Sequence, residues 1–184
     1  DFSGEVERTL NMADGCLLIV DAQEGPMPQT KFVLGKALAA ELKPIVILNK
    51  IDKPGSRTKE VEDELADLFL ELAVHEDQLH YPVYYAIGRA GKAWDKMPSD
   101  PENQEANLDP VFDAIINKIP APAVEQDKPF QMLVTALAHD TFKGKYAVGR
   151  INRGVVKQGD QVALCKKDGS IVRAKIDNVF MSHG

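Results

Sequence analysis

Cysteine, long apolar runs and metal-binding patterns are scarce or absent in this sequence. Its 184 residues include two cysteines, Cys16 and Cys165, each in an apolar stretch of a different part of the chain. We therefore expect both to be reduced core residues of a cytoplasmic protein, with no disulfide and no zinc site. No apolar run approaches the roughly 18 residues of a transmembrane helix, and no charged-then-apolar leader opens the chain, so we expect neither a membrane segment nor a secretion signal.

Two further absences exclude particular chemistry. The four histidines have no Cys or His partner at metal-ligand spacing and therefore predict no metal site; they are His75, His80, His139 and His183. Neither G-x-x-x-x-G-K-[ST] nor G-x-G-x-x-G occurs, so the sequence offers no loop to cradle the phosphates of a nucleotide. What is present, 44% hydrophobic and 27% charged residues, is the composition of a globular protein with a core.

The net charge of −6 combines two unlike parts. Residues 1–122 carry 12 basic and 22 acidic side chains, a charge of −10, whereas residues 123–184 carry 10 and 6, a charge of +4. The sign changes within 119–129, where three prolines predict a stiff linker. We therefore expect two modules, of which the basic second one is a candidate RNA surface.

The first module alternates strand patterns with helix patterns. Apolar runs at 16–20, 45–48 and 82–86 are typical of strands, and the first two are expected to be buried on both faces. Helical spacing of apolar residues separates them, most clearly at Val61, Leu65, Leu68 and Leu72. This alternation predicts an α/β fold with a parallel sheet covered by helices.

A last helix is expected to begin at Asp109, with Pro110 in its first turn. Its buried stripe is expected to consist of Phe112, Ile115, Ile116 and Ile119. Residues 88–108 before it are expected to form a long polar loop. Trp94 in that loop is interpreted as a lid over a local apolar patch, with an anchor for a partner as the alternative.

Beyond the linker no helical period survives. Residues 130–138, 146–152, 161–166 and 171–180 are predicted to be strands, with a tight hairpin turn at 168–169. The second module is therefore expected to be a small antiparallel barrel or sandwich that stops before closing.

Polar residues follow the predicted strands of the first module, at the edge where open α/β sheets bind ligands. The polar side chains are Asp21, Asn49, Lys50 and Asp52, and the third strand is followed by Ile87 and Gly88. Asp21 is expected to cap the loop that follows it, with a nucleotide contact as the alternative.

Asp52 has the clearest chemical meaning among these residues. A carboxylate can accept two parallel N–H bonds, which suits N1–H and the exocyclic N2–H of guanine, whereas adenine offers no such pair on that edge. A buried site of this kind can reject a base without those donors by about 10⁴-fold. Asn49 would tie its loop to neighbouring loops, and the stem of Lys50 would cover one face of the base. The alternative is a solvated Lys-Asp turn after a strand.

These patterns together resemble a known family. Residues 1–8, 18–22, 25–30 and 49–55 are similar to the middle of a translational GTPase, and most of all to the TypA/BipA family of ribosome-associated GTPases. The motifs at 149–151, 153–154 and 159–162 resemble the β-barrel domain II of these factors. Elongation factor G and LepA share much of the first part and remain alternatives.

The resemblance implies a P-loop-NTPase-like sheet. Residues 1–122 would be the C-terminal part of the GTP-binding (G) domain, 123–129 a linker and 130–184 an incomplete domain II. Its implied ligands are GTP or GDP with Mg²⁺, and its implied partner is the ribosome, through rRNA and ribosomal proteins. The guanine site would consist of Asn49, Lys50, Asp52, Ile87 and Gly88. Where the family has Ser-Ala this chain has Ile87 and Gly88, and the backbone N–H of Gly88 would still reach the guanine oxygen.

The resemblance also implies what lies elsewhere. The phosphate-binding loop, the Mg²⁺ ligands and the catalytic His would precede Asp1, so this chain alone is expected to be inactive. The family's preceding strand would lie beside 16–20, and we expect the open edge to favour self-association. The same resemblance implies that domain II faces the small ribosomal subunit. Its basic residues would then contact phosphates, with ordinary solubility of the barrel as the alternative. They are Lys143, Lys145, Arg150, Arg153, Lys157, Lys166 and Lys167. A different class, a non-catalytic ribosome- or RNA-binding module on a GTPase scaffold, is the remaining alternative.

Overall fold

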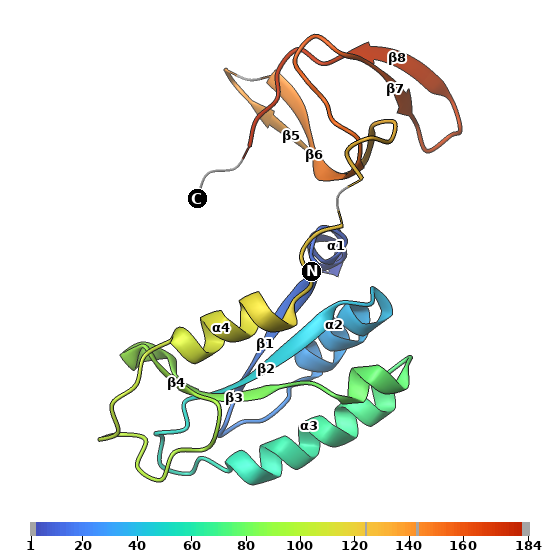
Figure 1. Ribbon diagram of the computed structural model, residues 1–184. Helices are drawn as coiled ribbons and strands as arrows, with labels where there is room; N and C mark the ends of the chain where they lie inside the picture. Colours follow the sequence, from blue (N-terminus) through green and yellow to red (C-terminus); the bar gives the residue numbers. More distant parts are fainter. Residues whose placement is uncertain (1–2, 124, 143, 182–184) are drawn as a thin grey trace. The chain divides into compact units, whose positions relative to one another are not determined.

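A computed structural model describes residues 3–123, 125–142 and 144–181 (Figure 1). The chain divides into two units, Asp1–Pro122 and Ala123–Gly184. Lys143 and His183, named above as candidates, lie outside the described residues. Among the described helices, none combines the length and the apolarity that crossing a bilayer demands.

The first unit is built on one four-stranded sheet in the order β1-β2-β3-β4. Its strands are β1 (Gly15–Asp21), β2 (Lys43–Asn49), β3 (Val83–Ile87) and β4 (Lys92–Trp94). Its helices are α1 (Ser3–Leu10), α2 (Pro28–Ala39), α3 (Thr58–Leu72) and α4 (Asp109–Lys118), with a 3-10 turn η1 (Glu76–Leu79) before β3. β1, β2 and β3 are parallel, as the alternating pattern predicts, and β4 is antiparallel to β3.

Helices cover both faces of this sheet. The larger cluster joins β1 and β2 to α2 and α3 through Leu18, Val20, Leu34, Leu38, Val46, Leu48, Val61, Leu65, Leu68 and Phe69. The smaller one joins β2, β3 and β4 to α4 through Ile47, Ala86, Ala93 and Val111. Residues 45–48 of β2 are buried on both faces as expected, because this strand lies inside the sheet between two helical layers.

β1 departs from the expected burial on both faces. Leu18 and Val20 are buried, but Leu17 is 39% exposed and Ile19 is 61% exposed. Side chains alternate along a strand, so Leu17 and Ile19 lie on the face that α4 covers. α4 packs over β2 and β4 and leaves Leu17 and Ile19 of the edge strand incompletely covered.

The expected stripe of α4 is wrong at two positions. Phe112 is 53% exposed and Ile116 is 76% exposed. The helix instead turns Val111, Ala114 and Ile115 towards the sheet. The two exposed residues are one helical turn apart and lie on one flank of α4.

Residues 88–108 contain more structure than the expected loop. A 3-10 turn, η2 (Gly88–Ala90), leads into β4, which pairs with β3. Trp94 ends this strand and is only 8% exposed, within the larger cluster. Its interpretation as a lid over apolar residues is confirmed, and the partner anchor is wrong. Three residues flanked by charged and polar neighbours give no strand period, which is why the sequence does not reveal β4.

The second unit consists of two antiparallel hairpins. β5 (Gln131–Asp140) pairs with β6 (Gly144–Arg153), and β7 (Gln161–Cys165) pairs with β8 (Ile171–Lys175). All four predicted strands are present, and the last ends at Lys175 rather than at residue 180. The turn between β7 and β8 places Gly169 at φ 83°, a conformation that glycine adopts without strain.

Side chains of the second unit remain accessible on both sides of its strands. None of its described residues is buried, because a two-stranded ribbon has no second layer to cover it. Cys165 is accordingly exposed, which corrects its assignment to the core, and Cys16 is half-buried. Both cysteines are free, as expected.

Candidate functional site

The carboxyl ends of β1, β2 and β3 meet at one edge of the sheet. The parallel register pairs Asp21 with Asn49 and Asn49 with Ala86. The loops that follow these residues therefore begin side by side, which is the usual ligand edge of an open α/β sheet.

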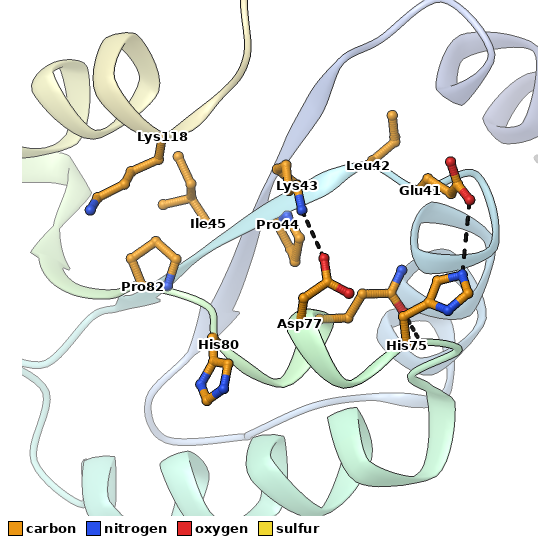
Figure 2. Close-up of a pocket in the computed structure, with 11 residues that line it drawn as sticks. Glu41, Leu42, Lys43, Pro44, Ile45, His75, Asp77, His80, Pro82 and Lys118 are labelled. Carbon is orange, nitrogen blue, oxygen red and sulfur yellow. Dashed lines mark hydrogen bonds and ion pairs between the residues drawn. The ribbon is translucent and has the colours of Figure 1, made fainter.

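A cavity of about 380 Å³ lies at the opposite edge, around the start of β2 and the segment that leads into β3 (Figure 2). Four of its ionisable groups lie in two pairs. Lys43 Nζ lies 3.1 Å from Asp77 Oδ2, and His75 Nε2 lies 3.9 Å from Glu41 Oε1. Because it lies at the starts of β2 and β3 and none of the site residues lines it, the cavity is not part of the candidate site.

Asn49 connects two of the site loops through one oxygen atom. Its Oδ1 accepts hydrogen bonds from the backbone N–H of Lys50 and from that of Gly88, both at 2.9 Å. The predicted role of Asn49 as a tie between loops is confirmed. A Cβ added at Gly88 would lie 3.3 Å from Asn49 Oδ1, so the absence of a side chain allows this close approach.

Lys50 is held in place from the side of β1. Its backbone has φ 64°, and its ammonium forms an ion pair with Asp21. Asp21 Oδ1 also accepts from the backbone N–H of Gln23 at 2.8 Å, which confirms its role as a loop cap. Burial acts to raise the pKa of Asp21, but the Lys50 ammonium and the Gln23 N–H outweigh it and hold that pKa below its usual value. The same contact raises the pKa of Lys50.

Asp52 lies beneath the surface of the site. Its side chain is 6% exposed and accepts a hydrogen bond from Arg89, whose Nη2 lies 2.8 Å from Asp52 Oδ2. Arg89 follows Gly88 directly, in η2, and its own side chain is 80% exposed. Sequence reasoning missed this residue, although a cation directly after a predicted loop residue is the signal that could have found it.

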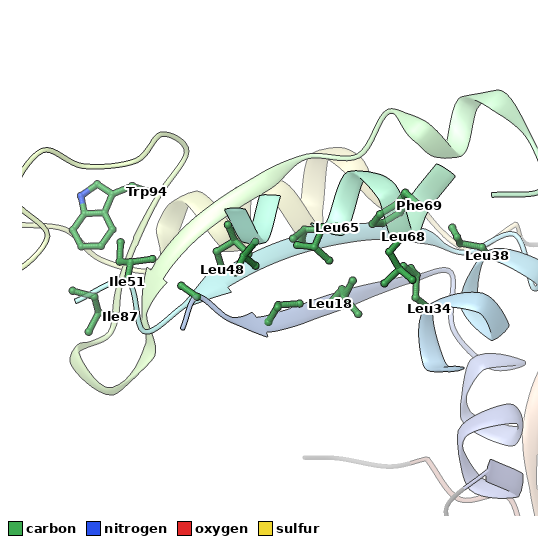
Figure 3. Packing of buried hydrophobic residues seen from close by; sticks show 14 residues of the cluster. Leu18, Leu34, Leu38, Leu48, Ile51, Leu65, Leu68, Phe69, Ile87 and Trp94 are labelled. Atoms are coloured by element: carbon green, nitrogen blue, oxygen red, sulfur yellow. The ribbon is translucent and has the colours of Figure 1, made fainter. Parts of the chain in front are cut away.

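Ile51 and Ile87 are buried side by side with Trp94 below these loops (Figure 3). Ile87 therefore contributes its side chain to the core, and only its backbone borders the site. Within the described part of the chain, the indole N–H of Trp94 has no hydrogen-bond partner.

The loop after β1 is fastened to α3 by Arg57. This guanidinium donates to the carbonyls of Gln23 (2.9 Å) and Glu24 (2.7 Å) and forms an ion pair with Glu64. Gly25 has φ 81°, and a Cβ there would overlap the Glu64 carboxylate and the guanidinium of Arg57. Sequence reasoning missed this arrangement, because it depends on residues more than 30 positions apart.

The described residues contain no group of three His, Cys, Asp or Glu side chains that could hold a metal ion. The acidic run at the start of α3 serves the structure instead. Glu64 pairs with Arg57, and Glu62 accepts a 2.7 Å hydrogen bond from the hydroxyl of Tyr85. Burial, together with that bond, raises the pKa of Tyr85 to about 12.

Comparison with known proteins gives the geometry its context. The elongation factor Tu GTP binding domain family matches residues 1–121. This chain belongs to that family. Its parallel sheet, with polar loops at the carboxyl ends of the strands, is thus the sheet of a GTP binding domain of the elongation factor Tu type.

The resemblance to the TypA/BipA family extends over the whole chain. The chain is 45% identical over 184 residues to the large ribosomal subunit assembly factor BipA of Synechocystis, and 44% identical over 184 residues to that of Bacillus subtilis. It spans 30% and 29% of those two proteins, less than a third of each. Elongation factor SelB of Methanococcus maripaludis, solved with the GTP analogue GppNHp, superposes with a TM-score of 0.64 at 20% identity, over 94% of this chain and 38% of that one. That likeness supports the fold of a GTP binding domain followed by antiparallel strands.

Proposed function

We propose that this chain is the base-binding part of a BipA-like translational GTPase, which binds GTP and hydrolyses it to GDP and phosphate. The observation that carries the proposal is the double hydrogen bond of Asn49 to the loops after β2 and β3, with the Asp52 carboxylate at the same edge. In this arrangement 1–122 is the later part of the G domain, 123–129 a linker and 130–184 the beginning of domain II.

Each site residue has a definite role in this proposal. Asp52 accepts N1–H and N2–H of guanine, while the stem of Lys50, fixed by Asp21, covers one face of the base. The backbone at Ile87 and Gly88 borders the guanine oxygen. The Gly88 N–H already donates to Asn49, so a base oxygen bound there shares that donor or replaces Asn49 as its acceptor.

The phosphates and Mg²⁺ belong to a part of the protein outside these residues. No phosphate-binding loop motif occurs in the sequence. We therefore assign the Mg²⁺ ligands and the residue that activates water to the region before Asp1, and we expect the 184-residue chain alone not to hydrolyse GTP.

The partner of the whole protein is the ribosome, in the cytoplasm. The support is the similarity to relatives that are named large ribosomal subunit assembly factors. The charge of the second part of the chain is compatible with RNA contacts, because Lys and Arg side chains bind phosphates. Within this proposal, the exposed edge of β1 also lets copies of the isolated chain associate.

The full-length protein that contains this chain, wild type and Asp52→Asn, provides the test. Fluorescent GDP is bound and then displaced with GDP, ADP or xanthosine diphosphate (XDP). Xanthine has an oxygen where guanine has its amino group, so an amide at position 52 should favour XDP, whereas wild type should prefer GDP by about 10⁴-fold over ADP. If neither protein discriminates among the three, the base-site assignment is wrong and the non-catalytic binding module becomes the better explanation.

A further inference from the structure

Arg89 reaches into the place where the loops after β2 and β3 meet. It starts from η2, directly after Gly88, and its Nη2 donates to Asp52 Oδ2 at 2.8 Å. Within the described residues, Arg89 is the side chain that pairs with this carboxylate. The contact therefore occupies one of the two oxygens of the carboxylate to which guanine recognition is assigned.

The chemistry of the two donors is closely related. A guanidinium is a planar fork of parallel N–H donors that matches a carboxylate. The recognition edge of guanine contains the same unit, because N1, C2 and N2 form a planar N–C–N group with its N–H bonds side by side. A carboxylate placed to accept from one of them can accept from the other, and a base that uses both oxygens of Asp52 competes with Arg89 for Oδ2.

Burial differs between the partners in a way that permits exchange. The Asp52 side chain is 6% exposed, and a carboxylate so enclosed is costly to leave without a partner. The Arg89 side chain is 80% exposed, so it can return to water with little loss, as is usual for ion pairs at a surface.

We propose that Arg89 is an intramolecular competitor of the guanine base for Asp52. In the nucleotide-free protein it keeps the buried carboxylate paired and oriented, and an arriving base displaces it into solvent. Arg89 thereby slows nucleotide association without contributing to the bound complex. This inference rests on the proposed function, since it requires Asp52 to be the base acceptor.

Stopped-flow binding of N-methylanthraniloyl-GDP to the nucleotide-free, full-length protein tests the competition. Arg89→Ala should raise the association rate constant by about two- to five-fold, the range expected for losing one exposed ion pair, and leave the dissociation rate constant unchanged. Lys53→Ala is the matched control. Lys53 is an exposed cation next to Asp52 in the sequence, so its removal changes the charge near the site but not the Asp52 contact.

Three results would overturn the inference: slower association in Arg89→Ala, faster dissociation, or the same rates as in Lys53→Ala. Faster dissociation would mean that Arg89 contacts the bound base. A double variant adds a specific check, because in an Asp52→Asn background the amide no longer forms an ion pair with Arg89. There, with N-methylanthraniloyl-XDP as the probe because this background is expected to prefer XDP, Arg89→Ala should not accelerate binding, and acceleration would show that the effect does not pass through residue 52.

The failure of this inference is distinguishable from the failure of the proposed function. If Asp52→Asn does not shift the preference from GDP towards XDP, the base site itself is wrong. If that shift occurs and Arg89→Ala does not accelerate association, only the competition is wrong.

Discussion

Asn49 shows how much of the site depends on one side-chain oxygen. Because Oδ1 holds both the Lys50 and the Gly88 N–H groups, Asn49→Ala should separate the two loops. We expect about 1 kcal/mol lower stability per lost hydrogen bond, measured by urea unfolding, and a larger loss of GDP affinity in the full-length protein. Asn103→Ala is the control, since the side chain of Asn103 bonds to Asp100, three residues away in an exposed loop. Unchanged GDP binding by Asn49→Ala would contradict the proposed arrangement.

Asp21 is expected to give the first unit part of its acid sensitivity. Its pKa in the folded protein lies below the ordinary value of 3.8. The ionised form therefore contributes stability above that ordinary value, and the contribution is lost as the pH falls through the lower folded pKa. Thermal unfolding between about pH 2 and 5 should show a weaker pH dependence for Asp21→Asn than for wild type. Asp113→Asn, at an exposed position of α4, should leave the dependence unchanged.

At the scale of the elements, an aromatic contact joins α3 to the segment that leads into β3. The Phe69 ring is fully buried and stacks on Tyr81 with centroids 3.7 Å apart. Phe69→Ala should lower the free energy of unfolding by about 3–5 kcal/mol, because it leaves a cavity that the helix cannot close. The neighbouring exposed Leu70→Ala should change it by less than about 0.5 kcal/mol. Urea unfolding of the two variants compares them directly, and equal effects would contradict the packing described.

The loop after β1 allows a second comparison between matched glycines. Gly25 and Gly91 both have positive φ, but only at Gly25 does an added Cβ meet neighbouring atoms. Both Ala variants carry backbone strain of order 1–3 kcal/mol. Gly25→Ala should be the more destabilised in thermal unfolding, because it also pushes apart Arg57 and Glu64. A larger effect at Gly91 would mean that the Arg57 contacts contribute little.

At the scale of the whole molecule, both β1 and α4 expose apolar side chains, and the two elements approach each other at one end. A Cβ at Gly15 would lie 2.7 Å from Ile119 Cγ1, so the end of α4 reaches over the start of β1. Ile116 and Phe112 lie one and two turns before Ile119 on the same flank, and thus turn towards the edge strand. Leu17 and Ile19 add two exposed apolar side chains to β1 itself.

We expect the isolated chain to self-associate through this edge. Ile19→Lys should shift its sedimentation profile towards the monomer, since a lysine on an edge strand opposes pairing with another strand. Leu70→Lys, an equally exposed position on α3, should leave the profile unchanged. A wild-type chain that sediments as a stable monomer at high concentration would contradict the expectation.

The sequence predicts the helices and strands correctly where the spacing of apolar residues follows one clear period. The apolar runs of β1 and β2 and the helical spacing of Val61, Leu65 and Leu68 determine the parallel sheet, and strand ends locate Asn49 and Asp52. Rotation of a helix about its axis is harder to predict. In α4, the stripe through Val111 and the stripe through Phe112 are both apolar. Which of them is buried depends on how the helix lies on the sheet.

Contacts between distant segments were beyond prediction for another reason. Arg57 meets the loop after β1, and Arg89 meets Asp52, through side chains that carry no periodic signal. β4 is too short to show a period at all. These features depend on tertiary placement, which determines what a charged residue can reach.

The single tryptophan of this chain is an intrinsic fluorescence probe. Trp94 is buried below the site loops, beside Ile51 and Ile87, and the second unit contains no tryptophan. Its emission spectrum therefore reports on the first unit alone, while far-ultraviolet circular dichroism sums over both. Melting followed by the two signals can separate the stabilities of the units without any label or cut in the chain.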